Sequence, residues 1–229
     1  MARILVVGML IVLLAACTSV TGSGNLVTRQ FDLDGFSRID AGHGAQVEVT
    51  LGDDFSVDVD VDDNVESMLD IYVSGDTLHI GLDVDSQVNV TFRVKVTMPE
   101  LTGVTLNGGS SLQGELSGGD LAVSLNGGSS LEGELSGGNL TVNINGGSRA
   151  TLTGTAGRVT IDVNGGSRAM LGDLAAGDVN LSANGGSHVE VNSSGTVTGS
   201  ANGGASVTVA GSPASVNVET NGGASVTRK

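Results

Sequence analysis

The chain has 229 residues, of which 25 are acidic and 10 are basic, so its formal net charge is −15. This balance argues against nucleic acid or an anionic membrane surface as a partner, because both repel a negatively charged protein. The single cysteine excludes an internal disulfide framework. The 37 glycines recur in register with apolar residues, which favours a regular fold over disorder.

The first residues predict export rather than a part of the fold. A positively charged start is followed by an apolar run from Ile4 to Leu14 and then by small residues, as in a secretory signal. The run is shorter than the roughly 20 residues needed to span a bilayer. Leu14-Ala15-Ala16-Cys17 also resembles the bacterial lipobox, in which the cysteine receives a diacylglycerol thioether. An ordinary signal peptide with an incidental cysteine is the alternative.

These features divide the chain into four expected segments. Residues 1–16 are a lipoprotein signal peptide, and residues 17–24 are the lipidated Cys17 and a small, polar tether. Residues 25–99 are irregular β coils, and residues 100–229 are regular repeats that continue the same fold. The protein is therefore expected to be exported and held on a bacterial membrane by its lipid, facing the periplasm or the exterior.

A fixed repeat dominates the second half of the chain. The motif Asn-Gly-Gly-Ser/Ala occurs seven times, with spacings of 19, 19, 19, 20, 18 and 19 residues. Self-similarity at such a period is the signature of a repeat architecture. The motif begins at Asn107, Asn126, Asn145, Asn164, Asn184, Asn202 and Asn221.

The residues around each asparagine alternate with a period of two. Leu121, Val123 and Leu125 precede Asn126 at alternate positions, which predicts a strand with one buried face. A second strand and a second glycine-containing turn complete each repeat, and helical periodicity is absent after the signal. The sequence therefore predicts an all-β, parallel β-solenoid with coils of about 19 residues, stacked roughly 4.8 Å apart.

The Asn-Gly-Gly turns are interpreted as structural. Two glycines permit positive φ at a corner without steric cost, and asparagine tolerates the left-handed region. Stacked asparagine side chains can also form an amide ladder between coils. The serines that follow, such as Ser110 and Ser129, have no histidine or acid at a fixed offset and are expected to be corner residues.

The aromatic residues lie only in the first part of the chain, where the last one is Phe92. The later coils must therefore enclose a thin core of valine, leucine, isoleucine and alanine. In the first part, alternating residues predict four strands before the Pro99-Glu100 junction. They are residues Gln46–Leu51, Phe55–Val61, Thr77–Leu82 and Val88–Met98.

Three features together resemble a known family. They are the aromatic segment with Phe31, Phe36 and Ile39, the junction Met98-Pro99-Glu100-Leu101, and the Asn-Gly-Gly-Ser coils. The family is named for a putative autotransporter adhesin head, the head GIN domain, and the resemblance covers residues 25–229. It implies a right-handed β-helix, a lipoprotein or secreted protein, and an adhesin-like role. It implies no catalytic residue, because the family has no agreed ones.

The best candidate for a ligand-facing surface is a basic stripe. Arg149, Arg168 and His188 each lie four residues after their asparagine, so stacking places them side by side on an otherwise acidic protein. The stripe would suit an anionic glycan. The alternative is that these residues only keep a hydroxyl-rich face soluble.

Two acidic groups suggest other chemistry. Glu115 and Glu134 should stack in adjacent coils, at a separation that resembles the carboxylate pair of a retaining glycosidase. Residues Asp58–Asn64 hint at a calcium loop, but Asp63 stands where an EF-hand has glycine and Leu69 where it has glutamate. The alternating valines favour a strand with a polar outer face. The three histidines share no ligand spacing, so we expect neither a structural metal nor a cofactor.

The sequence as a whole favours a non-enzymatic envelope lipoprotein with an adhesin-like or structural role. Its partners would be the membrane, through the lipid on Cys17, and a glycan or a surface protein. Two alternatives stay open. One is a polysaccharide-active β-helix enzyme, and the other is a scaffold that assembles by self-association through its end coils.

Overall fold

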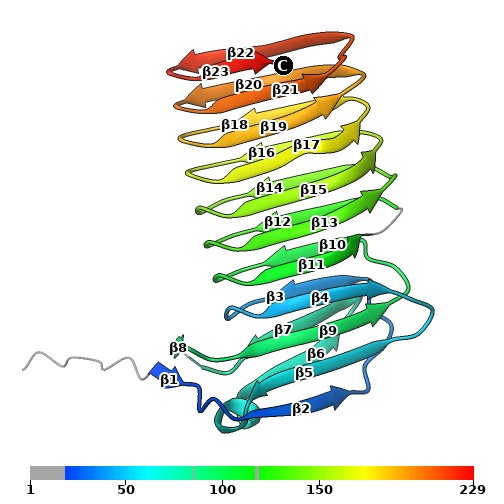
Figure 1. Cartoon of the computed structure of the whole chain (residues 1–229), viewed down its shortest axis with the longest axis vertical. Helices are drawn as coiled ribbons and strands as arrows, with labels where there is room; N and C mark the ends of the chain where they lie inside the picture. Colours follow the sequence, from blue (N-terminus) through cyan, green and yellow to red (C-terminus); the bar gives the residue numbers. More distant parts are fainter. Residues whose placement is uncertain (1–18, 85, 117–118) are drawn as a thin grey trace, which may run out of the picture.

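The computed structural model describes residues 19–84, 86–116 and 119–229, and Cys17 lies outside these ranges. The described strands form two long sheets of 10 and 11 strands that face each other across a narrow core, with a short two-stranded sheet at one end (Figure 1). Within the described residues, no helix is long and apolar enough to cross a membrane. The two facing sheets form the all-β solenoid that the sequence predicts.

The strands succeed one another along each sheet as follows. The ten-stranded sheet runs β22(Ser215–Gly222), β20(Thr196–Gly203), β18(Val179–Ala183), β16(Val159–Val163), β14(Leu140–Ile144), β12(Leu121–Leu125), β10(Gly103–Leu106), β3(Arg38–Ala41), β7(Thr77–Leu82) and β6(Leu69–Ser74). The eleven-stranded sheet runs β2(Leu26–Phe31), β5(Ser56–Asp62), β9(Phe92–Met98), β4(Gln46–Leu51), β11(Ser111–Leu116), β13(Ser130–Ser136), β15(Arg149–Ala156), β17(Arg168–Ala176), β19(His188–Ser193), β21(Ser206–Gly211) and β23(Ser225–Arg228). The small sheet pairs β1(Ser19–Thr21) with β8(Ser86–Val88), and a 3-10 helix, η1, spans Asp63–Met68.

Each regular coil contributes one strand to each long sheet, and equivalent residues of successive coils pair in parallel. Leu121 of β12 pairs with Leu140 of β14, and Leu140 pairs with Val159 of β16. The alternation therefore selects the inward residues correctly: Leu121, Val123 and Leu125 are all buried. The core is a single stack of aliphatic layers, thin enough to need no aromatic side chain after Phe92.

A ladder of amides runs along the corner formed by the Asn-Gly-Gly turns. Each asparagine Nδ2 donates to the Oδ1 of the asparagine one coil below, from Asn221 down to Asn107, at 2.9–3.2 Å. At its lower end Asn107 Nδ2 donates to Asp40 Oδ1 at 3.2 Å. The buried Ser110 hydroxyl closes its own turn by donating to the Asn107 carbonyl oxygen at 2.8 Å.

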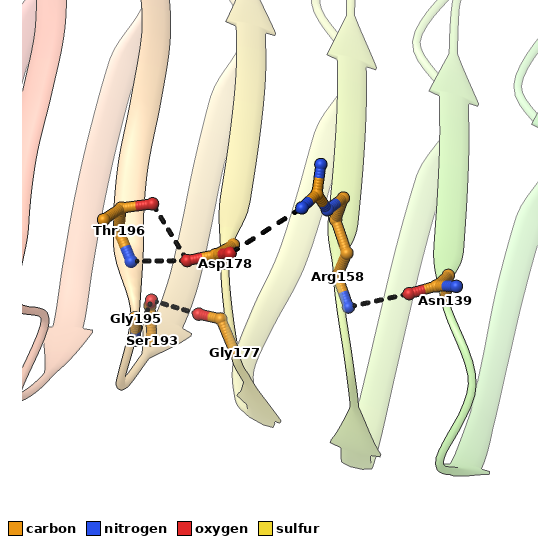
Figure 2. Close-up of polar contacts among 7 residues, drawn as sticks. All are labelled: Asn139, Arg158, Gly177, Asp178, Ser193, Gly195 and Thr196. Atoms are coloured by element: carbon orange, nitrogen blue, oxygen red, sulfur yellow. Dashed lines mark hydrogen bonds and ion pairs between the residues drawn. The ribbon is translucent and has the colours of Figure 1, made fainter.

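The opposite corner carries a second, less uniform column of polar contacts (Figure 2). Asn139 Oδ1 accepts the Arg158 backbone N–H at 3.1 Å, and Asp178 Oδ1 accepts both the N–H and the hydroxyl of Thr196 at 2.9 Å. Arg158 Nη2 lies 3.9 Å from Asp178 Oδ2. Side chains at this corner thus pair with the backbone of the next coil.

The regular stack begins earlier than residue 100. Strands β3 and β4 pair in parallel with β10 and β11, so residues 38–51 form a coil of the same kind. Its turn is Gly42-His43-Gly44, which departs from the Asn-Gly-Gly pattern and was not recognised in the sequence. His43 has φ 55°, close to the φ 60° of Gly108 at the equivalent position.

The early coil is also inserted between segments that follow it in the chain. Strand β4 lies between β9 and β11, and β3 lies between β7 and β10. The irregular region predicted over residues 25–99 contains antiparallel pairs, β2 with β5, β5 with β9, and β6 with β7, at the lower end of the stack (Figure 1). The strand expected over Val88–Met98 begins only at Phe92, as β9, because Val88 is the last residue of β8 and Asn89, with φ 51°, interrupts the extended chain.

The amide ladder predicts a position-dependent loss of stability. Asn145→Ala removes a donor to Asn126 and the acceptor of Asn164 from a half-buried corner, and should lower the free energy of unfolding by about 1–3 kcal/mol. Asn221→Ala removes one hydrogen bond from an exposed corner and should cost less than about 1 kcal/mol. Urea unfolding of both variants tests the difference. Equal losses would show that the ladder does not stabilise the stack.

The second corner predicts an acid-dependent contribution. Hydrogen bonds from the Thr196 backbone and hydroxyl, with the Arg158 guanidinium, hold the pKa of Asp178 below its usual 3.8. A group with a depressed pKa stabilises the fold above its unfolded pKa and loses that contribution as the pH falls through its folded pKa. Asp178→Asn should therefore be destabilising near neutral pH, and its difference from the wild type should shrink below about pH 3.8. Urea unfolding near neutral pH and below about pH 3.8 measures the difference in free energy of unfolding between Asp178→Asn and the wild type, with the exposed Asp54→Asn as control. A difference that stays the same at both pH values contradicts the prediction.

Candidate functional site

The basic stripe lies on the outer face of the eleven-stranded sheet, as the repeat register requires. Arg149 pairs with Arg168, and Arg168 pairs with His188, on strands β15, β17 and β19. Both arginines are exposed, while His188 is partly covered and its Nε2 lies 3.2 Å from Glu190 Oε1. Two like charges are thus held on adjacent strands, about 4.8 Å apart.

A bulge in β17 opens a hollow beside the stripe. Between Leu171 and Ala175 the register shifts, so that β17 carries extra residues relative to both neighbours. A bulge bends its strand and redirects the side chains around it. The resulting hollow has a volume of about 330 Å³. Its charged lining residues are Arg149, Asp173, Glu190 and Lys229.

Only one of the three residues predicted for the basic stripe lines this hollow. Of the stripe, Arg149 lines the hollow, whereas Arg168 and His188 lie beside it. Asp173, Glu190 and Lys229 were not singled out from the sequence. The signal that could have found the bulge is the spacing of 20 residues between Asn164 and Asn184, where the other coils have 18 or 19.

The acidic segment Asp58–Asn64 has two different roles. Asp58 and Asp60 lie on β5, in register with Lys95 and Arg93 of β9, which fits a strand with a polar outer face. Asp62 is completely buried, and its two carboxylate oxygens accept the backbone N–H groups of Gly24 at 2.6 Å and Thr91 at 2.7 Å. In the part of the chain that the structure describes, no three acidic or histidine side chains are placed to hold a metal ion.

Residues of the acidic segment Asp58–Asn64 also bind residues 19–24, which the sequence predicts as part of the tether. Strand β1 pairs with β8, Asn64 Nδ2 donates to the Thr21 carbonyl at 2.8 Å, and Ser23 Oγ donates to Asp63 at 2.5 Å. A β-carbon on Gly22 would lie 2.6 Å from the Asn89 carbonyl oxygen, so only glycine fits there. From Ser19 onward the segment is therefore packed against the domain rather than extended away from it.

The two glutamates considered for catalysis are neighbours, as expected. Glu115 of β11 pairs with Glu134 of β13, and both are exposed. A hollow of about 420 Å³ beside them is lined by Glu48, Glu115 and Glu132 but not by Glu134. The next coil places Thr153 opposite Glu134, which ends the acidic row. Glu115 therefore borders this hollow while Glu134 lies outside it, so the two carboxylates do not line the same hollow.

Comparison with known proteins places this fold in a recognisable group. Residues 35–213 match the family described as "Putative auto-transporter adhesin, head GIN domain". A putative adhesin of Bacteroides fragilis has a similar structure, with a TM-score of 0.84 and 21% identity over 92% of this chain and 100% of that one. A putative lipid binding protein of Parabacteroides distasonis (TM-score 0.74, 18% identity) covers 93% of this chain and matches over 100% of its own length.

A third solved structure agrees with these two. It is a putative adhesin of Parabacteroides merdae, with a TM-score of 0.72 and 17% identity over 92% of this chain and 99% of that one. At these identities the likeness shows the fold alone. No curated protein sequence matches the chain.

The buried carboxylate of Asp62 generates a prediction about the N-terminal segment. Asp62→Ala leaves two backbone N–H groups without their acceptor and should lower the free energy of unfolding by about 1–3 kcal/mol. Hydrogen exchange should accelerate at Gly24 and in β1, with little change in the upper coils. Asp60→Ala, on the outer face of the same strand, is the control. Unchanged exchange at Gly24 would contradict this role for Asp62.

Proposed function

We propose that this chain, which belongs to the putative auto-transporter adhesin, head GIN domain family, is a non-enzymatic envelope protein that attaches to an anionic glycan. The observation that carries the proposal is the basic stripe on the bulged face. Arg149 and Arg168 are exposed on adjacent strands of a protein whose formal net charge is −15. Carboxylate or sulfate groups spaced along a polysaccharide are the ligands that such paired guanidinium groups bind.

The shape of the face supports this interpretation. The outer surface of a parallel, in-register sheet is long and flat, and it presents a short, repeated spacing along the stack. The bulge adds one hollow with arginine and lysine at its rim and carboxylates beside them. A polymer lying on the face could place an acidic group on the arginines and hydroxyl groups against Asp173 and Glu190.

The proposal includes anchoring through a lipid on Cys17. Strand β1 begins at Ser19, two residues after this cysteine, and the buried Asp62 holds the segment that follows it. A lipid at Cys17 would therefore keep the lower end of the stack close to the membrane. The stripe lies toward the other end of the solenoid, nearer the C-terminal strands (Figure 1).

Replacing the arginines by serine tests the proposal without disturbing the fold, because serine occupies the same position at Ser111 and Ser130. The full chain, purified in mild detergent, is passed over immobilised heparin, polygalacturonate and neutral dextran. The double variant Arg149→Ser, Arg168→Ser should lose at least about ten-fold in affinity for the anionic polymers. Wild-type retention should weaken with salt, because exposed charges are screened.

Arg158→Asn is the matched control, since it removes one exposed arginine from the other corner, where the preceding coil has Asn139. Arg158→Asn is compared with the single variant Arg168→Ser, because each of these two variants removes one positive charge. Equal retention of the double variant and the wild type would refute the stripe as the binding surface. Release of reducing sugar ends during the assay would instead favour the enzyme alternative and direct attention to Glu115 and Glu134.

A further inference from the structure

A second feature lies on the ten-stranded sheet, at the coil whose turn departs from the repeat. Here His43 adopts φ 55° at the position where the equivalent residue of the next coil, Gly108, has φ 60°. A residue with a β-carbon costs energy in this region, where glycine does not. Strained residues that persist in a regular scaffold gather at binding and active sites, which makes the surroundings of His43 a candidate site.

A row of side chains on this face ends in an exposed aromatic ring. Tyr72 of β6 pairs with His79 of β7, and their rings stack with centroids 4.8 Å apart and planes inclined by 18°. His79 Nδ1 lies 3.6 Å from Asp40 Oδ2, and Asp40 Oδ1 accepts the amide of Asn107. The lower end of the amide ladder thus fixes Asp40, and Asp40 with His79 orients the tyrosine. Tyr72 is 45% exposed although it is a large aromatic residue.

Beside this row two glycines, Gly81 and Gly42, leave space on the outer face of the sheet. On the next position of the same strands Asp70 pairs with Gly81, and Gly42 stands where the next coil has Asn107. His43 lies over Gly81 and its Nδ1 accepts the Leu82 N–H at 3.4 Å. The result is a hollow of about 250 Å³. Its lining includes Asp40, His43, Asp70, Tyr72, His79 and Asn107.

We propose that this hollow binds a ring of a neutral sugar. Tyr72 is 45% exposed and lines the hollow, so its ring carbons offer apolar contacts to the C–H groups of a pyranose. The carboxylates of Asp40 and Asp70 accept hydrogen bonds from hydroxyl groups, as charged acceptors do most strongly. The volume is smaller than the roughly 300–1,000 Å³ of clefts for drug-sized ligands, which suits one sugar ring held at an open surface. The site is independent of the arginine stripe, which lies on the other sheet.

Two other ligand classes fit less well. A divalent metal would need three or more ligands in reach, and the described residues hold no such group of acidic or histidine side chains. A quaternary ammonium ion prefers a cage of several aromatic rings, whereas Tyr72 is here the one exposed phenol, with a histidine on one face. A sugar uses both the apolar ring carbons of Tyr72 and the carboxylates of Asp40 and Asp70.

The test is binding of cellotetraose and chitotetraose to the full chain in mild detergent, followed by saturation-transfer NMR and calorimetry. Tyr72→Ala should weaken the affinity about three- to ten-fold, whereas Tyr72→Phe should keep the aromatic ring and most of the binding. Gly81→Val should abolish binding, because the nearest atoms around a β-carbon there leave ordinary contact distances of 3.4–3.8 Å and the side chain would fill the hollow. Thr160→Val, on the outer face of the same sheet, is the control.

A further variant removes the backbone strain at His43 and tests whether its side chain contributes to binding. His43→Gly matches the later turns and should leave the fold intact, but it removes one side wall of the hollow and should therefore weaken the tetrasaccharide affinity. The double variant Arg149→Ser, Arg168→Ser should bind the neutral tetrasaccharides as the wild type does, so this result is separable from the proposed attachment function. Equal binding by Tyr72→Ala and the wild type overturns the proposal. So does saturation by tetramethylammonium without tetrasaccharide binding, and so does the absence of binding by any probe.

Discussion

The structure depends on one constraint: a parallel, in-register stack places each residue directly beside its own equivalent in the next coil. A residue is therefore favoured at a repeated position when its side chain tolerates a copy of itself about 4.8 Å away. Leucine and valine do so in the core. Asparagine does so at the corner, because an amide both donates and accepts a hydrogen bond, and the ladder from Asn221 to Asn107 is the result. A carboxylate or a guanidinium group cannot satisfy its own copy in this way.

This constraint explains why departures from the repeat carry the functional argument. Like charges on directly paired strands are destabilising, yet Arg149 and Arg168 are paired, and they lie next to the bulge around Gly172. The amide ladder ends on Asp40 of β3, because the corner position of that coil, two residues later, is Gly42 instead of asparagine. Asn107 occupies one carboxylate oxygen of Asp40, which leaves the other for a different partner. His79, on which Tyr72 is stacked, lies beside that second oxygen.

The sequence predicts the coils well, because their period is local. Strands β4 and β7 have the bounds expected from alternation, and the inward leucines and valines are buried. The sequence does not predict that β3 and β4 lie between β7–β9 and β10–β11. Alternation says which face of a strand is buried but not which strand lies beside it. The antiparallel pairs of the lower end lack a repeat that would fix their neighbours, and the role of the buried Asp62 depends on contacts with Gly24 and Thr91, far away in the chain.

The two candidate surfaces have consequences for how such a protein would hold a polymer. A flat solenoid turns its two sheets in opposite directions, so a single polysaccharide cannot lie on the arginine stripe and in the Tyr72 hollow without passing around a corner. The corner is occupied by the amide ladder or by the column around Asp178, whose side chains are already paired with neighbouring coils. Two different polysaccharide chains would therefore bind, one to each sheet of the solenoid. Linked weak sites bind a network more strongly than either site binds alone, provided that both can be engaged at once. A rigid stack meets this condition, because its register fixes the distance between the hollow near the N-terminal coils and the stripe beyond them.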